Sequence, residues 1–395
     1  MNLLFAHDHR FLVDAAGRHF TTGSFPAYVW QRYLKVFDTI TVLARIGDAP
    51  EGHNHAISSH PGVDFEKCAD LNNLSSLLKL AQRDRRAIED QVAKADAVIA
   101  RLPSEIGNAV AKACQRQGKP YLIEVVGCAW DAYVNHGRLA GRMFAPLAVR
   151  RMRQTIDEAP LAIYVTKDWL QSRYPTRGVS DHVSNVEIPV PDEDVLALRM
   201  HRIASLRDGR PAVAGTIASL KVRYKGLQTA IPAIAKLRLE GQDIRFRILG
   251  SGDQQPWRRL AEEHGVSDLV TFDGSRPAGA AVFEWLDEID IYLQPSFQEG
   301  LPRSTIEAMS RGCACVGSTA GGIPELLPAE RTHAPGDTGS LARVIEGLAR
   351  SPSKIEQAAR RDIAVSQQYT GDLLQERRER MLRRLRDAAA SNGSS

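Results

Sequence analysis

Two glutamates that stand eight positions apart, Glu299 and Glu307, flank the run Gly300-Leu301-Pro302-Arg303-Ser304. We expect a strand end, a tight loop and then a helix over residues 301–312. Pro302 suits the first helical position, where a missing N–H costs nothing, and Gly300 lets the backbone come close to a ligand. The free N–H groups within residues 302–305, with the helix dipole behind them, would form an anion site.

The spacing of the two glutamates indicates the shape of the ligand. Glu307 lies just over one turn into the predicted helix, and Glu299 lies before it. Because a carboxylate accepts hydrogen bonds from neighbouring hydroxyls, each glutamate suits a ring that carries hydroxyls. A nucleotide sugar has such a ring at either end and a diphosphate in the middle. The start of a solvated helix would show the same two glutamates, so the spacing alone leaves that alternative open.

Short apolar runs alternate with helical stretches along the chain, in two sets. Such runs are typical of parallel strands in α/β units, and two sets predict two Rossmann-like domains. We place the boundary in residues 188–195, where two prolines and three acids stand, which gives domains over 1–190 and 191–367. The predicted strands are residues 3–7, 39–46, 97–102, 120–127 and 159–166 in the first set, and 211–219, 244–250, 269–274, 289–295 and 313–318 in the second.

Residues 294–328 closely resemble the signature of the retaining glycosyltransferase family 4. The matching elements are Pro295-Ser296, Glu299-Gly300, Glu307-Ala308-Met309 and Gly321-Gly322-Ile323-Pro324-Glu325. The resemblance implies the GT-B fold, an α/β architecture of two Rossmann-like domains whose parallel sheets face each other across an interdomain cleft. It also implies that a final helix, expected over 368–388, packs back onto the first domain. Matching motifs support the resemblance over residues 211–328, and only the order of strands and helices supports it over the residues before 211.

The resemblance further implies the reaction, which is transfer of a sugar from a nucleoside-diphosphate sugar with retention at the anomeric carbon. No cofactor and no metal are expected, and the donor is the substrate. Lys225 would neutralise the diphosphate as a mobile point charge, Glu299 would hold the donor sugar and Glu307 the ribose. The other implied donor-binding positions are Ser219, Arg223, Gly250, Ser251, Asp273, Gly300, Leu301, Pro302, Arg303 and Ser304.

The chain departs from the family pattern at two places. The family's second cation aligns with Ser219, so Lys221, Arg223 and Arg303 stay open as alternative sources of charge. The family's histidine after strand 120–127 is absent, and Asp131 is the candidate that would accept the acceptor's proton. A helix cap explains Asp131 equally well. Retaining transfer does not require a protein base, because the leaving diphosphate oxygen can take the proton.

A long loop is expected after the first strand, over residues 7–26. The resemblance implies that a glycine in this loop contacts the donor; Gly23 is our candidate and Gly17 is the alternative. His7, Asp8 and His9 stand where the strand is expected to end. No partner cluster accompanies them, so we do not predict a metal site there.

Composition and charge limit the partners. The chain has 395 residues and a net charge of +4, which allows an anionic substrate without demanding nucleic acid. Its five cysteines are scattered, which fits a reduced cytoplasmic setting, and the N-terminus shows no signal-peptide pattern.

Residues 138–153 contain five arginines and no acid, with Leu139, Met143, Phe144 and Leu147 between them. This pattern indicates a helix lying on an anionic membrane surface, or an ordinary helix that buries those apolar residues. It favours a glycan or polyprenyl-linked acceptor in cell-envelope polysaccharide synthesis. Two other functions stay open at this point: another GT-B reaction on a nucleotide sugar, such as that of an epimerase or hydrolase, and a non-catalytic nucleotide-sugar-binding module.

Overall fold

The computed structural model describes residues 1–23, 25–68, 82–134, 139–190 and 192–392. The chain divides into two compact units, which we describe separately. The N-terminal unit consists of Met1–Val183 and Gln375–Ser395, and the C-terminal unit of Ser184–Leu374. The large hydrophobic clusters each lie within a single unit. Each unit therefore has a core of its own, as independent domains do.

The C-terminal unit is built on a sheet of six parallel strands in the order β12-β11-β10-β13-β14-β15. Counted from β10, this is the 3-2-1-4-5-6 order of Rossmann folds. Such sheets bind ligands beyond the carboxyl ends of the strands where the order reverses, here between β10 and β13. The strands are β10 (Val213–Ile217), β11 (Arg245–Leu249), β12 (Val270–Phe272), β13 (Ile291–Gln294), β14 (Ala314–Ser318) and β15 (Thr332–His333).

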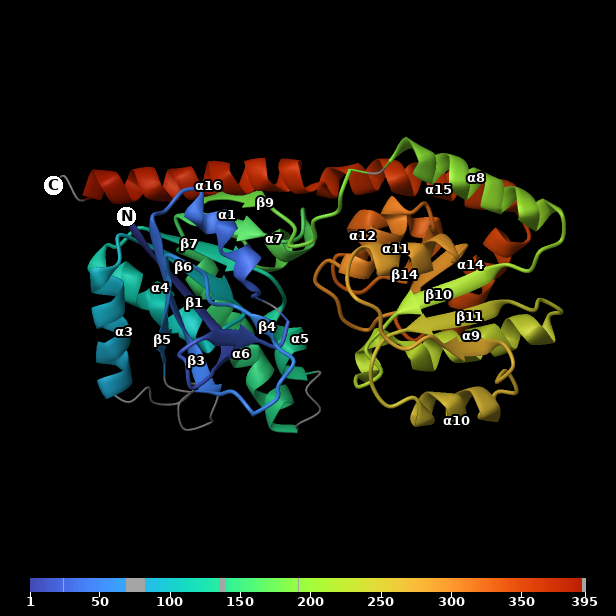
Figure 1. Ribbon diagram of the computed structural model, residues 1–395, viewed down its shortest axis with the longest axis horizontal. Helices are drawn as coiled ribbons and strands as arrows, with labels where there is room; N and C mark the ends of the chain where they lie inside the picture. The colour runs from blue at the N-terminus through green and yellow to red at the C-terminus, as the bar shows by residue number, and fades with distance from the viewer. Residues whose placement is uncertain (24, 69–81, 135–138, 191, 393–395) are drawn as a thin grey trace. The chain divides into compact units, whose positions relative to one another are not determined.

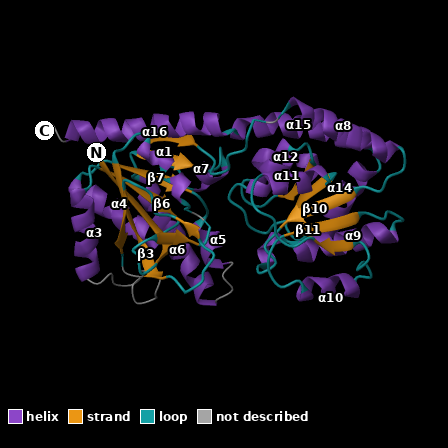
Figure 2. Cartoon of the chain, in the orientation of Figure 1, coloured by secondary structure: helices purple, strands orange, loops and turns teal. Residues whose placement is uncertain are grey.

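Helices cover both faces of this sheet (Figures 1 and 2). Residues of α9, α10 and α14 share a core with one face, and residues of α11, α12 and α13 share a core with the other. α8 packs against α15. The helices are α8 (Glu193–Arg207), α9 (Leu227–Leu239), α10 (Gln255–Glu263), α11 (Ala280–Asp287), α12 (Arg303–Ser310), α13 (Ile323–Leu326), α14 (Thr338–Ala349) and α15 (Pro352–Ser366), with 3₁₀ turns η2 (Arg223–Lys225), η3 (Ala329–Arg331) and η4 (Gln367–Tyr369).

The N-terminal unit contains a second parallel sheet, in the order β5-β3-β1-β6-β7-β8-β9. Two short antiparallel strands, β2 and β4, extend it beside the end of β1. The strands are β1 (Asn2–Val13), β2 (His19–Thr21), β3 (Thr39–Asp48), β4 (Ala56–Ile57), β5 (Val63–Lys67), β6 (Ala97–Leu102), β7 (Tyr121–Val125), β8 (Leu161–Tyr164) and β9 (Val179–His182).

The last helix of the chain supplies the end of the N-terminal unit. From Gln375 onward it lies against that unit, where Arg380 pairs with Asp181 at 2.7 Å and Arg377 bonds the ring of His182 at 2.7 Å. The unit's helices are α1 (Gln31–Leu34), α3 (Gln82–Lys94), α4 (Glu105–Gln117), α5 (Ala129–Val134), α6 (Leu139–Asp157), α7 (Trp169–Arg173) and α16 (Gly371–Asn392), with the 3₁₀ turn η1 (Ala27–Val29).

All ten predicted strands are present, and nine of them end within two residues of the predicted limits. The exception is the first, because β1 continues through His7, Asp8 and His9 to Val13 and turns back into β2. The long loop predicted there was wrong. A register irregularity between Ala6 and Arg10 places four polar residues in the strand, and a polar run of that kind resembles a loop.

The cysteines and helices bear on two further expectations. All five cysteines are buried and unbridged. Within the described ranges, no helix has both the length and the hydrophobicity needed to cross a bilayer.

Candidate functional site

The loop between β13 and α12 carries the two glutamates. Pro302 is the N-cap residue of α12, with φ −73° and ψ 116°, so its predicted place as the first helical residue was wrong. Its ring fixes φ but leaves ψ free to stay extended, and the helix therefore starts at Arg303. Leu301 packs against the core instead of joining the helix. The amides of residues 303–305 form the first turn, where no intrahelical acceptor exists.

Gln294, the last residue of β13, organises the donors around Glu299. It is 1% exposed, and its amide nitrogen donates to Glu299 Oε1 at 2.8 Å. Its amide oxygen accepts from the hydroxyls of Ser304 at 3.1 Å and Thr305 at 3.2 Å, and Tyr292 lies at 3.1 Å. A buried amide that is satisfied in this way holds the strand end and the start of α12 in one fixed arrangement.

Glu299 receives three donors on the same oxygen. Besides Gln294, Lys225 Nζ lies 2.6 Å and Ser296 Oγ 2.8 Å from Oε1. No described residue donates a hydrogen bond to the second oxygen, Oε2. The carboxylate is therefore held in place by one oxygen, and the other stays available for hydroxyls of a ligand.

Two glycines explain how Lys225 and Glu299 come together. Gly226 has φ +83°, and a Cβ there would lie 1.9 Å from the backbone oxygen of Pro295. Gly321 has φ +60°, and a Cβ there would lie 1.9 Å from the backbone oxygen of Glu299. Only glycine fits at either place. The Lys-Gly pair and the Gly-Gly of the signature are thus needed for packing around Glu299.

Glu307 differs from Glu299 in that no described residue donates a hydrogen bond to its carboxylate. Its side chain is 20% exposed, and Arg303 Nη2 lies 3.9 Å from Oε1, beyond hydrogen-bond distance. Burial raises the pKa of Glu307, and the positive charge of Arg303 partly opposes that shift in pKa. A largely buried carboxylate without a donor costs free energy, and a ligand that brings hydroxyls would recover it.

The loops after β10, β11 and β12 hold the other predicted positions. A Cβ on Gly250 would lie 1.8 Å from the oxygen of Ala218, and Ser251 O accepts from Leu220 N at 2.9 Å. We predicted Gly250 for contact with a ligand, but the structure shows that packing between two loops already requires it. One carboxylate oxygen of Asp273, Oδ2, accepts from Arg247 at 2.8 Å and from Trp285 at 2.7 Å, so protein side chains already hold that oxygen.

The three alternative cations lie in different surroundings. Lys221 is exposed in the loop after β10. Arg223 lies in η2, with its guanidinium 5.7 Å from the ring centroid of Trp257. Arg303 is the first residue of α12, and its side chain is 63% exposed. Ser219 is exposed on the same loop as Lys221. Arg303 is thus the cation nearest to the free amides.

A family model described as glycosyl transferases group 1 matches residues 211–351. Protein CapJ of Staphylococcus aureus is 30% identical over 346 residues, which are 87% of this chain and 85% of CapJ. The chain belongs to the glycosyl transferases group 1.

Further comparisons agree with this assignment. The putative colanic acid biosynthesis glycosyltransferase WcaL of Salmonella typhimurium is 35% identical over 134 residues, 31% of this chain and 32% of WcaL. The solved structure of HepE from Anabaena in complex with UDP matches with a TM-score of 0.65 and 16% identity, over 99% of this chain and 100% of that one. The predicted GT-B fold of this group 1 glycosyltransferase is confirmed.

The candidate residues near β1, in the N-terminal unit of this glycosyltransferase, lie in different surroundings from one another. Gly23 has φ +147° and is exposed, and a Cβ there would meet nothing within 4 Å. Gly17 sits in the turn between β1 and β2. Asp8 accepts from the amides of Glu105 and Ile106 at 2.8 and 2.9 Å and thereby caps α4. Burial lowers the pKa of His7, and it lowers that of His9 to about 4, so both rings are neutral at pH 7.

Asp131 is the third residue of α5, and its side chain is hydrogen-bonded to Cys128, the residue before the helix. Burial raises the pKa of its carboxyl, and Arg173 opposes that shift in pKa. A raised pKa brings a carboxylate closer to the value that proton transfer at neutral pH favours.

Gln294, which connects Glu299 with the start of α12, was not predicted from the sequence. A signal was present, because a glutamine ends the apolar run IDIYLQP. A polar side chain at the carboxyl end of a central parallel strand points to a ligand edge.

Proposed function

We propose that this glycosyltransferase moves a sugar from a UDP-sugar to a hydroxyl of a glycan or polyprenyl-linked acceptor, with retention at the anomeric carbon. The observation that carries this proposal is the pair of carboxylates around the start of α12. Among the described residues, none donates to Glu307 or to the second oxygen of Glu299, and none accepts from the amides of residues 303–305 between them. Solved HepE structures contain UDP and UDP-glucose, which supports this class of donor.

The first turn of α12 would hold the diphosphate. Its amides and Lys225 would stabilise the negative charge that grows on the leaving group as the glycosidic bond breaks. Glu307 would accept from the ribose hydroxyls and Glu299 Oε2 from hydroxyls of the donor sugar. Because Lys225, Arg303 and the amides supply the positive charge, the reaction we propose uses no metal.

The proton of the acceptor hydroxyl has two destinations in this proposal. The leaving diphosphate oxygen lies on the face of the sugar that the acceptor approaches in a retaining transfer, so it can take the proton directly. Asp131 would orient the acceptor hydroxyl or receive its proton on the N-terminal side. Gly23 would let the backbone come close to the donor.

The proposal for the acceptor rests on helix α6 of the N-terminal unit. On α6, Met143 is 80% exposed and Leu147 39% exposed, and Arg150 is exposed beside them. These residues suit a helix lying on anionic lipid, and the relative WcaL is named for colanic acid biosynthesis. We therefore propose a cytoplasmic enzyme of cell-envelope polysaccharide synthesis that works at the membrane surface.

A thermal-shift screen of UDP-, GDP-, ADP- and CMP-sugars tests the donor. A specific donor at a hundred times its dissociation constant should add about 2.7 kcal/mol of stability. The matching sugar should then reach an acceptor with the same anomeric configuration, as judged by NMR of the product. Inversion would contradict the retaining mechanism, and an absence of stabilisation by every nucleotide sugar would contradict the function.

A further inference from the structure

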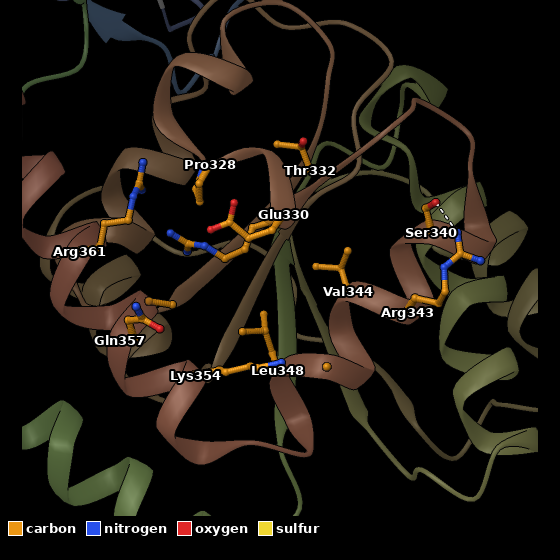
Figure 3. A pocket seen from close by; sticks show the side chains of 13 residues that line it. Pro328, Glu330, Thr332, Ser340, Arg343, Val344, Leu348, Lys354, Gln357 and Arg361 are labelled. Carbon is orange, nitrogen blue, oxygen red and sulfur yellow. Dashed lines mark hydrogen bonds between the residues drawn. The ribbon is translucent and has the colours of Figure 1, made fainter.

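The C-terminal unit has a cavity that shares no lining residue with residues 294–307, which we call the donor loop. Its volume is about 660 Å³, which lies in the range of sites for small organic ligands. η3 and β15 form one wall, and α14 and α15 form the others (Figure 3).

Positive charge dominates this cavity. Its lining contains Arg331, Arg343, Lys354 and Arg361 against one carboxylate, Glu330. Asp362 lies behind them and binds both Arg331, at 2.7 Å, and Arg361, at 2.9 Å. Four cations against the two carboxylates leave a net charge of +2.

Two of the cations are available to a ligand. Arg343 donates to the neutral hydroxyl of Ser340 at 2.7 Å. A hydrogen bond from the amide of Ser340 lowers the pKa of Asp337 most, and the positive charge of Arg343 also lowers that pKa. Asp337 lies outside the lining, and no ion pair joins it to Arg343 among the described residues. No described residue pairs with the ammonium of Lys354. The two side chains come from different helices, α14 and α15, and both are exposed at the cavity. An anionic group would bind both without breaking an existing ion pair.

The space between the cations is apolar. Figure 3 shows Arg361 and Arg343 on opposite sides of the cavity, with Val344 and Leu348 between them and Lys354 beside Leu348. A ring-shaped body would cover the two apolar side chains, and anionic groups on it would reach the cations at the edge. A single inorganic ion would leave the apolar surface exposed to water.

We propose that this cavity binds a phosphorylated metabolite with a ring-shaped body, and that its binding strengthens the donor site. The connection is a short segment. His333, which follows the lining residue Thr332 in β15, accepts through its backbone oxygen from Thr319 N at 2.8 Å. Two residues further on, Gly321 packs against Glu299, and Gly322 N donates to Gly300 O at 2.7 Å.

The coupling follows from that connection. A ligand that holds η3 and β15 in place also holds segment 319–322, which supports the backbone of Glu299 and Gly300. By linkage, the ligand should then raise the affinity for UDP, and UDP should raise the affinity for the ligand by the same factor. This second half rests on the proposed donor site; the binding itself does not.

Calorimetric titration with glucose 6-phosphate, AMP and fructose 1,6-bisphosphate, each with and without saturating UDP, tests the site. At least one should bind with a Kd below roughly 1 mM and should still bind when UDP is present. Arg343→Glu and Lys354→Glu should each weaken that binding about tenfold or more, as expected for loss of a charged partner. Arg360→Glu makes the same charge change on α15 outside the lining and should leave the Kd unchanged. Circular dichroism and melting temperature confirm that each variant is folded.

Four results would overturn the proposal. Failure of all three metabolites to bind, or equal binding by the charge-reversed variants, removes the site. Binding that UDP abolishes places the metabolite at the donor loop instead. Binding that leaves the affinity for UDP within threefold refutes the coupling. If UDP itself did not bind, the proposed function would fail, while the titrations without UDP would still decide the cavity.

Discussion

Glu307 shows how a single residue can be costly in the free protein and useful to the ligand. Glu307 belongs to α12. Its carboxylate is largely buried, and no described residue donates a hydrogen bond to it. Burial raises its pKa, which means that the folded protein holds the proton more tightly than the unfolded chain does. The stabilising effect of that proton is complete below the unfolded pKa and is lost as the pH rises through the folded pKa.

Glu307→Gln should therefore separate stability from binding. The variant should melt at a higher temperature than the parent at pH 7.5, with a difference that shrinks as the pH falls through the raised pKa of Glu307. Its affinity for UDP should fall by about 1.5–3 kcal/mol, because a charged hydrogen-bond acceptor is lost. Calorimetry and melting curves at several pH values measure both effects. Unchanged affinity for UDP would remove Glu307 from the donor site.

Glu299 should behave differently, since it already has protein partners. Glu299→Ala should cut turnover far more than it weakens UDP binding, because in our proposal Oε2 accepts from hydroxyls of the donor sugar, which UDP lacks, while Oε1 is bonded to Lys225, Gln294 and Ser296. Steady-state kinetics and UDP titration on the same preparation give the comparison. A loss of nucleotide affinity as large as the loss of turnover would contradict this role.

Residue types in the donor loop were predicted from the sequence, but their partners were not. The order of Glu299, Pro302 and Glu307 predicted an anion site at the start of a helix, and α12 does start there, at Arg303. The Lys225–Glu299 contact and the central amide of Gln294 depend on how η2 and β13 meet in space, which spacing along the chain does not determine. The requirement for Gly321 likewise follows from a contact with a residue 22 positions away.

At the scale of elements, the loop from β14 to α13 acts as a support for the loop from β13 to α12. Gly321→Ala should displace Glu299, because the new Cβ would lie 1.9 Å from its backbone oxygen. Gly265→Ala is the matched control, since Gly265 has φ +68° and open space around it. Both should lose about 1 kcal/mol from the positive φ, but only Gly321→Ala should also lose most of the turnover. Equal turnover in the two variants would show that the support is not needed.

The helix α6 gives a prediction of a different kind. The apolar residues that it buries in the core are Ala148, Met152 and Ile156, so α6 has a buried stripe as the ordinary-helix alternative expects, but Met143 and Leu147 lie outside that stripe, at 80% and 39% exposure. Leu139 and Arg142 lie outside the described side chains, and Arg138 lies outside the described residues. Arg153 donates to Arg173 O at 2.9 Å, and Arg151 lies 4.0 Å from Glu105, which leaves Met143 and Arg150 as the informative targets.

Met143→Glu combined with Arg150→Glu should therefore reduce binding to phosphatidylglycerol vesicles in a sedimentation assay by about tenfold, through lost apolar contact and charge. Arg259→Glu, on α10, changes one charge elsewhere and should have little effect. If the parent protein did not sediment with these vesicles, the membrane proposal would fail.

Elements were easier to predict than their arrangement in sheets. Each parallel strand is a buried apolar run with small or polar residues at its ends, and that pattern is local. β2, β4, β5, β9 and β15 were not predicted, because short strands at the side of a sheet are half exposed and lack such a run. The strand order also had to come from the structure, since it depends on which runs pair.

For the whole molecule, the sequence predicted the class and the fold, and the family comparisons confirm both. The C-terminal unit carries the full signature, and the proposal of a nucleotide-sugar donor rests on that unit. The N-terminal unit has the expected layout without a motif of its own, so the acceptor remains a proposal built on α6 and Asp131. Two separate cores make it reasonable to treat donor binding as a property of the C-terminal unit.

The central claim is that a diphosphate docks on the first turn of α12 between two carboxylates. A crystal structure of the protein soaked with UDP tests it most directly. Our account predicts phosphate oxygens within hydrogen-bond distance of the amides of residues 303–305, with ribose hydroxyls on Glu307. UDP bound elsewhere, or a first turn closed by the protein's own side chains, would contradict it.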